Sequence, residues 1–193
     1  TAANFLAYGN NLQVVRVAGT GALNAASVTA TAELIGNEDQ FLANVVEATF
    51  LAKYPGALGN ALTVHVCDST GFTGWAYESL FDSAPSADEY HIAVVDTTGA
   101  FTGTADTVLE KFAYVSTVAG TKKADGTLNY FKDVLNRNSA YVWAGTGSIT
   151  LTAGRLADAL EGGANGSYTT DAPIVTGAAL FADAEQVDVS LLM

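Results

Sequence analysis

The chain has 193 residues, 49% of them hydrophobic, which is enough to fill the core of one sizeable domain or two small ones. Only 15% of its residues are charged and its mean hydropathy is +0.24, which excludes a disordered acidic chain. Its net charge is −12, and this surplus of acid disfavours binding to nucleic acid or to an anionic membrane. No apolar run approaches the ~20 residues of a membrane-spanning helix, and no signal peptide is visible.

The single cysteine, Cys67, excludes an internal disulfide and is compatible with a reducing cytoplasm. The chain has no initiator Met, and both of its ends lie inside patterned sequence. We therefore expect it to be a piece of a longer protein.

The first third of the chain predicts short strands with one helix among them. Asn37 precedes Gln40 by three residues, the spacing of a capping box, and so predicts the start of that helix. Valine-rich and alternating segments predict the strands. In chain order we expect the end of a helix closed by Gly9, a strand over Leu12–Ala18, a loop over residues 19–26, a strand over residues 27–34, the helix over residues 37–45, and strands over residues 46–54 and 62–68.

The rest of the chain continues this mixture of strands and short helices. Its clearest helix is NYFKDVLNRN (residues 129–138), whose apolar residues form one stripe at helical spacing. Residues 75–81 remain ambiguous. We expect strands over Tyr90–Asp96 and residues 106–116, 140–145 and 186–193, turns over residues 97–105 and at Asp125–Gly126, a glycine-rich surface loop over residues 160–173, and a helix over residues 174–185. Strands outnumber helices, which indicates an α+β fold with a sheet-dominated middle.

The segment AKYPGALGNALTVHV (Ala52–Val66) joins two predicted strands through residues that break strands. Pro55 fixes its own φ and has no backbone N–H, so a sheet ladder must stop there. Gly56 and Gly59 permit turn conformations that are closed to other residues, and Asn60 can cap or turn through its side chain. The segment predicts a rigid corner, with an ordinary loop as the alternative. If φ of Gly59 is positive, Gly59→Val should destabilise the fold.

Residues with catalytic or metal-binding chemistry are few. His65 and Cys67 share one face of a predicted strand, but two ligands fall short of the four of a structural zinc site. Ser148 lies in GTGSIT, which lacks the G-x-S-x-G order of a nucleophile elbow, and neither His65 nor His91 has a matching context. We therefore predict no catalytic residue, no metal site and no bound cofactor.

The segment VVRVAGTGALNAA resembles the opening of a dinucleotide-binding fingerprint, because Gly19 and Gly21 follow a predicted strand. Asn24 holds the place of the third glycine, and the β-branched residues that follow do not predict the required helix. The glycines of residues 162–166 lack the Lys-Ser/Thr ending of a phosphate-binding loop. A dinucleotide-binding oxidoreductase domain remains an alternative of a different class.

Five segments of the chain match, in order, the motifs of one family. AKYPGALGNALTVHV matches A-[KR]-Y-P-G-x-x-G-N-x-[LI]-x-V, and residues 108–143 match an E-x-F strand, a polar turn and N-Y-[FYV]-x-D-V-[IL]-N-x-x-S-x-[YF]. NFLAYGNNLQVVRV, LEGGANG and ALFADAEQVDVSLLM supply the other three matches. Together, over residues 4–193, these segments resemble the tail sheath proteins of contractile bacteriophages.

This resemblance implies an outer, protruding domain inserted into an inner one. It implies a β-sandwich or barrel-like protruding domain with short flanking helices, and terminal strands belonging to an inner α/β sheath domain. Residues 1–18 would be the N-terminal flank of the inner domain, residues 19–152 the protruding domain, and residues 153–193 the return to the inner domain. Relative to the family, the chain would lack the N-terminal arm and the C-terminal part of the inner domain.

The same resemblance implies a structural role and no enzymatic activity. A sheath subunit polymerises around the tail tube and contracts to drive the tube through the host envelope. Its partners would be other sheath subunits, the tail tube and baseplate proteins, with no nucleic acid and no membrane insertion. Its place would be the virion, after assembly in the host cytoplasm, and this fragment alone should be monomeric. The sheath of a related secretion or bacteriocin-type injection machine is the alternative within the same class.

Overall fold

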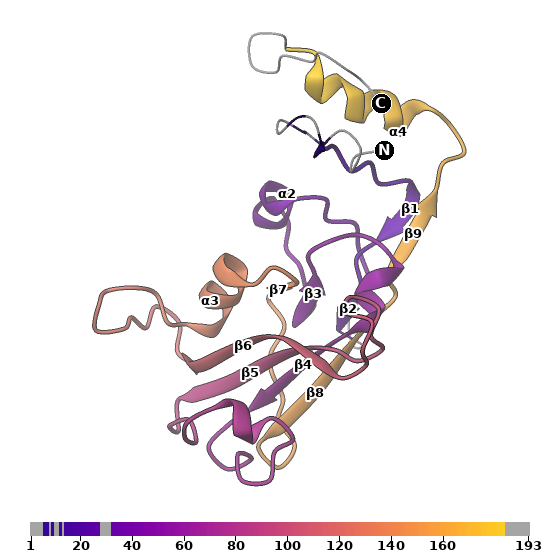
Figure 1. The fold of residues 1–193 in the computed structure, drawn as a ribbon. Coiled ribbons are helices and arrows are strands. Elements are labelled where there is room, and N and C mark those ends of the chain that lie inside the picture. Colours follow the sequence, from indigo (N-terminus) through magenta and orange to yellow (C-terminus); the bar gives the residue numbers. More distant parts are fainter. Residues whose placement is uncertain (1–5, 8, 10–11, 13, 28–31, 184–193) are drawn as a thin grey trace. The chain divides into compact units, whose positions relative to one another are not determined.

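The computed structural model describes residues 6–7, 9, 12, 14–27 and 32–183. They divide into two compact units. The larger unit is Ala22–Asn165, and the smaller one consists of the described residues within Thr1–Gly21 and Gly166–Met193. The division falls within two strands, β1 (Thr20–Leu23) and β9 (Ala164–Ser167), which pair as a two-stranded sheet (Figure 1). The assignment of residues 1–18, 19–152 and 153–193 to inner and outer sheath domains remains a prediction.

The larger unit is built on a seven-stranded sheet of order β6-β5-β4-β8-β2-β3-β7, in which every neighbouring pair is antiparallel. In the centre of the sheet, His65 of β4 lies opposite Ala93 of β5 on one side and opposite Ala157 of β8 on the other. The strands are β2 (Ala26–Ser27), β3 (Phe50–Ala52), β4 (Leu62–Cys67), β5 (Glu89–Asp96), β6 (Thr107–Ser116), β7 (Val142–Ala144) and β8 (Arg155–Glu161).

Helices are short in both units. The larger unit contains α2 (Glu38–Ala43) and α3 (Phe131–Asn138), with 3₁₀ turns η1 (Ala57–Ala61) and η2 (Glu78–Leu80). The smaller unit contains α4 (Ala172–Ala178), which continues into η3 (Ala179–Phe181). The α+β, sheet-dominated fold class predicted from the sequence is confirmed.

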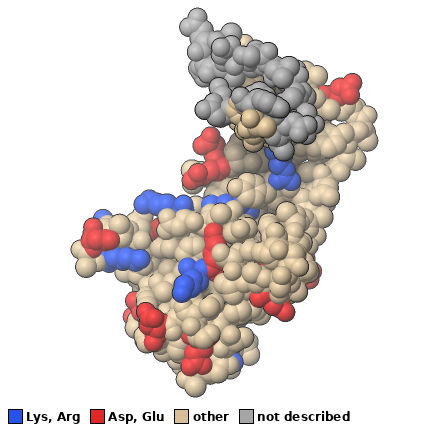
Figure 2. Space-filling model, viewed as in Figure 1, with Lys and Arg blue, Asp and Glu red and all other residues tan. Residues whose placement is uncertain are grey.

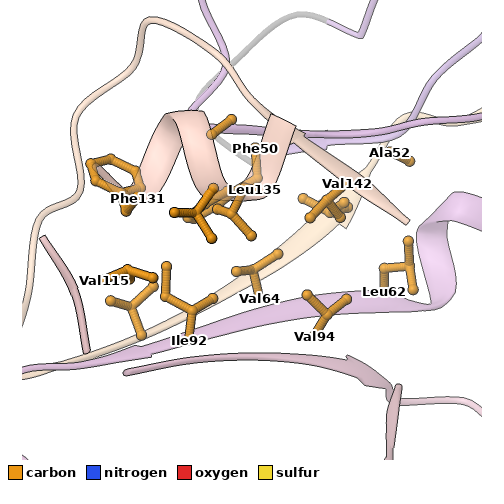
Figure 3. Close-up of a cluster of buried hydrophobic side chains, with 14 of the residues drawn as sticks. Phe50, Ala52, Leu62, Val64, Ile92, Val94, Val115, Phe131, Leu135 and Val142 are labelled. Atoms are coloured by element: carbon orange, nitrogen blue, oxygen red, sulfur yellow. The ribbon is translucent and has the colours of Figure 1, made fainter. Parts of the chain in front are cut away.

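The main core lies between α3 and one face of the sheet, where apolar side chains point toward one another (Figure 3). Alternate residues of the central strands point to this face, as the two-residue repeat of a strand requires. Its fully buried members include Phe50, Leu62, Val64, Ile92 and Leu135. Phe131 and Leu135 bring the apolar stripe of α3 onto the strands, so the stripe predicted from the sequence is confirmed.

The opposite face of the sheet is also covered. Phe72, Trp75 and Phe81, from the segment between β4 and β5, pack on Cys67 and Ala93. Elsewhere, the α2 region covers β2, β3 and β7, where Phe41 stacks on Trp143 with ring centroids 4.8 Å apart. Strands that are buried on both faces need apolar residues at successive positions, which explains runs such as residues 92–95.

The curl of the sheet brings its two ends together. The edge strands are β6 and β7, yet Glu110 of β6 accepts hydrogen bonds from Ser139 Oγ at 2.6 Å and from the Ala140 N–H at 2.7 Å, just before β7 begins. Ser139 Oγ in turn accepts from the Val142 N–H at 3.0 Å. The Glu110 carboxylate therefore links the edge strand β6 to the segment that enters the other edge strand, β7, and α3 packs inside the curl.

Several local predictions are confirmed. Asn37 is the N-cap of α2, and its Oδ1 accepts from the Gln40 N–H at 2.9 Å. The reciprocal bond goes one residue further back than in a standard capping box, because Gln40 Oε1 accepts from the Gly36 N–H. Strands β3 to β7, helix α3 and the turns after β5 and at Gly126 lie where the sequence places them. The described part of residues 174–185 is helical through Phe181.

Other local predictions are wrong. Residues 14–18 form no strand, and Val14 is 77% exposed, because β-propensity gives a strand only where a partner strand accepts it. Residues 19–26, predicted as a loop, contain β1, and the predicted loop at 160–173 contains β9. These glycine-rich segments pair with each other, which neither segment reveals alone. Residues 32–34 are not a strand. The predictions for residues 28–31 and 186–193, and most of the predicted helix end at Gly9, lie outside the described residues.

Glu110→Ala should lower the free energy of unfolding by about 1–3 kcal/mol, because it leaves the Ser139 hydroxyl and the Ala140 N–H without their acceptor. Urea unfolding followed by tryptophan fluorescence measures this. The exposed Glu47 gives a matched control, and Glu47→Ala should change stability by no more than about 0.5 kcal/mol. Equal unfolding midpoints for Glu110→Ala and the parent chain would contradict the link.

Candidate functional site

The corner between β3 and β4, residues 53–61, is a turn that several hydrogen bonds hold in place. Lys53 still pairs with β7, since its N–H donates to Tyr141 O at 2.8 Å. After the buried Pro55, Gly56 adopts a φ of 132° and donates its N–H to Leu23 O at 2.9 Å. A φ of that sign is rare for residues with a Cβ, so Gly56 is required by backbone conformation. The predicted end of the ladder at Pro55 is confirmed.

Gly59 is required for a different reason from the one weighed in the sequence. It lies in η1 and is not among the glycines of positive φ. A Cβ at this position would lie 2.8 Å from the Cβ of Ala52 and 2.9 Å from the Cβ of Ala25. Gly59 thus allows η1 to pack directly on the methyl groups of Ala52 and Ala25, and the explanation through positive φ is wrong.

Side-chain amides attach this corner to the segment after β8. Asn60 Nδ2 donates to Gly163 O at 3.0 Å, and the Gly163 N–H donates back to Asn60 Oδ1 at 2.7 Å. The Ala57 N–H donates to Asn165 Oδ1 at 2.9 Å. Asn60 therefore makes long-range bonds in place of the local cap or turn expected of it. These bonds hold the corner in a fixed position within the larger unit.

The fingerprint-like segment GTGALN has a structural role. Asn24 is fully buried and donates from Nδ2 to Ile35 O at 3.0 Å and to Ala52 O at 2.9 Å, while its Oδ1 accepts from the Ile35 N–H. Gly21, with φ of 78°, lies inside β1, and β2 follows at Ala26. The Asn24 side chain thus connects its own segment to those that contain Ile35 and Ala52. No observation here favours the dinucleotide-binding alternative.

Asp96, at the end of β5, organises the loop over residues 97–105. Its carboxylate accepts from the backbone N–H groups of Ala100, Phe101 and Thr102 and from Thr102 Oγ1, at 2.9–3.0 Å. Burial raises the pKa of this carboxyl, but the bonds from Thr102, Phe101 and Ala100 outweigh it and the net pKa is lowered. The sequence predicts the turn but gives no sign that Asp96 holds it.

The two side chains weighed in the sequence as metal ligands, His65 and Cys67, each contact other groups of the protein. Cys67 packs against Phe72, Trp75 and Phe81, and burial raises the pKa of its thiol to about 11. His65 Nε2 lies 3.2 Å from Tyr77 OH, and burial lowers its pKa. Within the described residues, no group of three His, Cys, Asp or Glu side chains could hold a metal ion.

His91 is a fully buried histidine whose two ring nitrogens are both bonded. The Tyr114 N–H donates to Nδ1 at 3.2 Å, so Nε2 must carry the hydrogen that it donates to Ser83 O at 2.8 Å. Phe81 stacks on the ring with centroids 4.1 Å apart. This arrangement fits only the neutral ring. Burial lowers the pKa of His91, and its bond to Ser83 opposes that effect only in part.

Ser148 is exposed and far in sequence from both histidines, each of which is bonded elsewhere. It lines an open pocket of about 210 Å³ with Tyr90, Tyr130 and Lys132. Lys132 Nζ donates to Gly147 O at 2.9 Å, and burial lowers its pKa. No histidine or carboxylate is among the residues that line the pocket, and the Lys132 amine there is bonded to Gly147 O.

On the face seen in Figure 2, the acidic side chains are scattered, and most of the visible Lys and Arg side chains lie across the middle of the molecule. Exposed apolar side chains occur in both units, among them Leu42 of α2 and Val45 just after it, and Val175 and Leu180 of the smaller unit. Of the helices in the described part of the chain, none is long and apolar enough to cross a membrane.

Across the described residues, many polar side chains bond loops and corners to the sheet. No family model matches the chain. It is similar to a tail sheath protein of Salmonella phage ViI, with 37% identity over 131 residues. The match covers 66% of this chain and confirms its resemblance to tail sheath proteins, although the chain spans about a fifth of that relative's length.

Gly59→Ala should lower the free energy of unfolding by about 1–3 kcal/mol, because the added Cβ overlaps the Ala52 and Ala25 methyl groups. Ala25→Gly in the same chain should recover part of the loss by removing one overlap. Gly36→Ala is the control, since its Cβ would meet only the flexible Gln40 side chain. Thermal unfolding that left Gly59→Ala as stable as Gly36→Ala would show that the corner tolerates a side chain.

Stability should fall as the pH is lowered from about 7.5 to 5.5. His65 and His91 have a lowered pKa in the folded chain, so below their ordinary pKa of about 6.5 the unfolded chain binds more protons. The slope can reach about 1.4 kcal/mol per pH unit for each histidine. His65→Gln should reduce the slope and leave the part that belongs to His91. A free energy of unfolding that is constant over this range, measured by urea titration, would contradict the neutral, bonded state of His91.

Proposed function

We propose that this chain is part of a structural subunit of a contractile phage tail sheath. The observation that carries the proposal is its likeness to a phage tail sheath protein over 131 residues. The rigid, multiply bonded sheet unit supports it, because such a subunit moves as a solid body. In this account the protein is a component of the virion, assembled in the host cytoplasm.

Within this proposal, the protruding domain, predicted over residues 19–152, lies almost entirely in the larger unit Ala22–Asn165. The smaller unit would lead into the inner domain, through the chain segments before β1 and after β9. Exposed apolar residues of α4 and η3, such as Val175 and Leu180, are then surface that the inner domain would cover.

The proposed mechanism uses no bond-making step. Subunits assemble with one another around the tail tube, on the baseplate, in an extended lattice. On triggering they move as rigid bodies into a compact lattice that buries more surface, a shift between two packings of one interface. At ~25 cal/mol per Å² of apolar area, a few hundred Å² newly buried per subunit would supply several kcal/mol. Many subunits acting together would then drive the tube.

Electron microscopy of the complete polypeptide that carries this chain tests the proposal. It should form striated tubes of regular repeat. The 193-residue chain by itself should remain monomeric in light scattering, because the surfaces that join subunits lie mainly outside it. A complete polypeptide that stays unassembled in the presence of purified tail tubes and baseplates would count against the function, and so would turnover of a small molecule by the purified chain.

A further inference from the structure

A pocket in the larger unit lies at the start of α3, next to the loop that follows β7. Its volume is about 210 Å³, below the ~300 Å³ at which pockets for drug-sized ligands begin, so it suits a group the size of one side chain. Tyr90, Tyr130 and Ser148 line it, and no described residue bonds the hydroxyl group of any of them. The pocket therefore has three hydroxyl-bearing side chains that a ligand can bond.

Lys132 brings a partly buried cation to the same pocket. Its Nζ donates to Gly147 O at 2.9 Å, which leaves two of its three N–H groups without an acceptor among the described residues. Burial lowers the pKa of this amine, and no carboxylate in the described part of the chain opposes the effect. Lys53 differs, because Glu38 and Glu110 oppose the effect of burial on its pKa. A cation removed from water is normally paired with an anion, and Lys132 lacks that partner within the described residues.

The chain around the pocket is basic, although the protein as a whole is acidic. Residues 117–149 contain four basic and two acidic residues, a net charge of +2, whereas the whole chain carries −12. Lys122 and Lys123 are exposed in the segment between β6 and α3. Asp133 follows Lys132 directly, but successive residues of a helix do not face each other. An anion that the chain as a whole repels is thus attracted to this part of its surface.

We propose that the pocket beside Lys132 binds a carboxylate from an acidic segment of a partner protein. The two oxygens of a carboxylate can accept from the remaining N–H groups of Lys132 and from the neighbouring hydroxyls. No arginine lines the pocket, and the planar fork of arginine suits phosphate best, which favours a carboxylate over a phosphate. Further acidic residues of the same segment would be attracted by Lys122 and Lys123. The inference goes beyond the sheath function proposed above and does not depend on it.

A blocked peptide of glutamate residues is the probe, and the same peptide with glutamine in place of glutamate is its control. NMR titration of the chain should show binding of the glutamate peptide alone, with the largest shifts at the backbone amides of Lys132, Gly147 and Ser148. Lys132→Gln should weaken this binding roughly tenfold, because it removes a charged hydrogen-bond donor. Arg137→Gln removes the same charge from the exposed far end of α3 and should weaken binding by less than about twofold.

Ser148→Glu carries the test without altering Lys132. Its carboxylate would take the place of the ligand's carboxylate, so the chain should no longer bind the glutamate peptide. Thr150→Glu adds the same charge at an exposed position that does not line the pocket, and this variant should keep most of the binding. If Lys132→Gln fails to fold, this pair of variants decides between the outcomes.

Unchanged binding of the glutamate peptide by Ser148→Glu would overturn the proposal. So would shifts centred away from the pocket, or the absence of shifts at a peptide concentration of about 10 mM. Equally strong binding of inorganic phosphate or of single-stranded DNA would also overturn it, because either result would identify a general anion-binding surface.

Discussion

The carboxylate of Glu110 joins the two ends of the sheet, and the architecture of the larger unit depends on that closure. If the seven-stranded sheet were flat, the short helix α3 could not cover the whole apolar face on which it packs. Curling the sheet around α3 encloses the side chains of Phe131 and Leu135, and every strand of the sheet except β2 contributes residues to this core. The closure uses polar side chains, because the edge strands β6 and β7 are not neighbours in the ladder.

Polar side chains elsewhere in the larger unit also hold separate segments of the chain together. Asn24 holds three segments together from a fully buried position, Asp96 holds the loop after β5, and Asn60 fixes the corner to Gly163. In each case a side chain satisfies backbone groups that the sheet cannot, which is the requirement on any buried turn. Together they give a unit in which loops move with the sheet. A part that transmits force through its shape needs this property, and it needs no reactive group.

The sequence predicts best those features that depend on near neighbours. The cap at Asn37, the apolar stripe of α3 and the runs of β4 and β5 are local patterns, and each lies where it was expected. Strands β1, β8 and β9 were not anticipated, because their glycine and charged residues become strand only through partners far along the chain. The need for glycine at position 59 was visible, but its cause, contact with Ala25 and Ala52, was not. For Glu110 no local signal exists, since its partners, Ser139 and Ala140, lie far along the chain.

We expect the larger unit to move as one solid body, with its corner as rigid as its central strands. Native-state hydrogen exchange on the chain tests this most directly, by comparing residues 53–61 with β4 and β5. The account predicts that the bonded amides of Lys53 and Gly56 open with a free energy close to that of the central strands, because all are released by one global unfolding. Exchange at the corner through a much smaller local opening, while β4 and β5 remain protected, would contradict it.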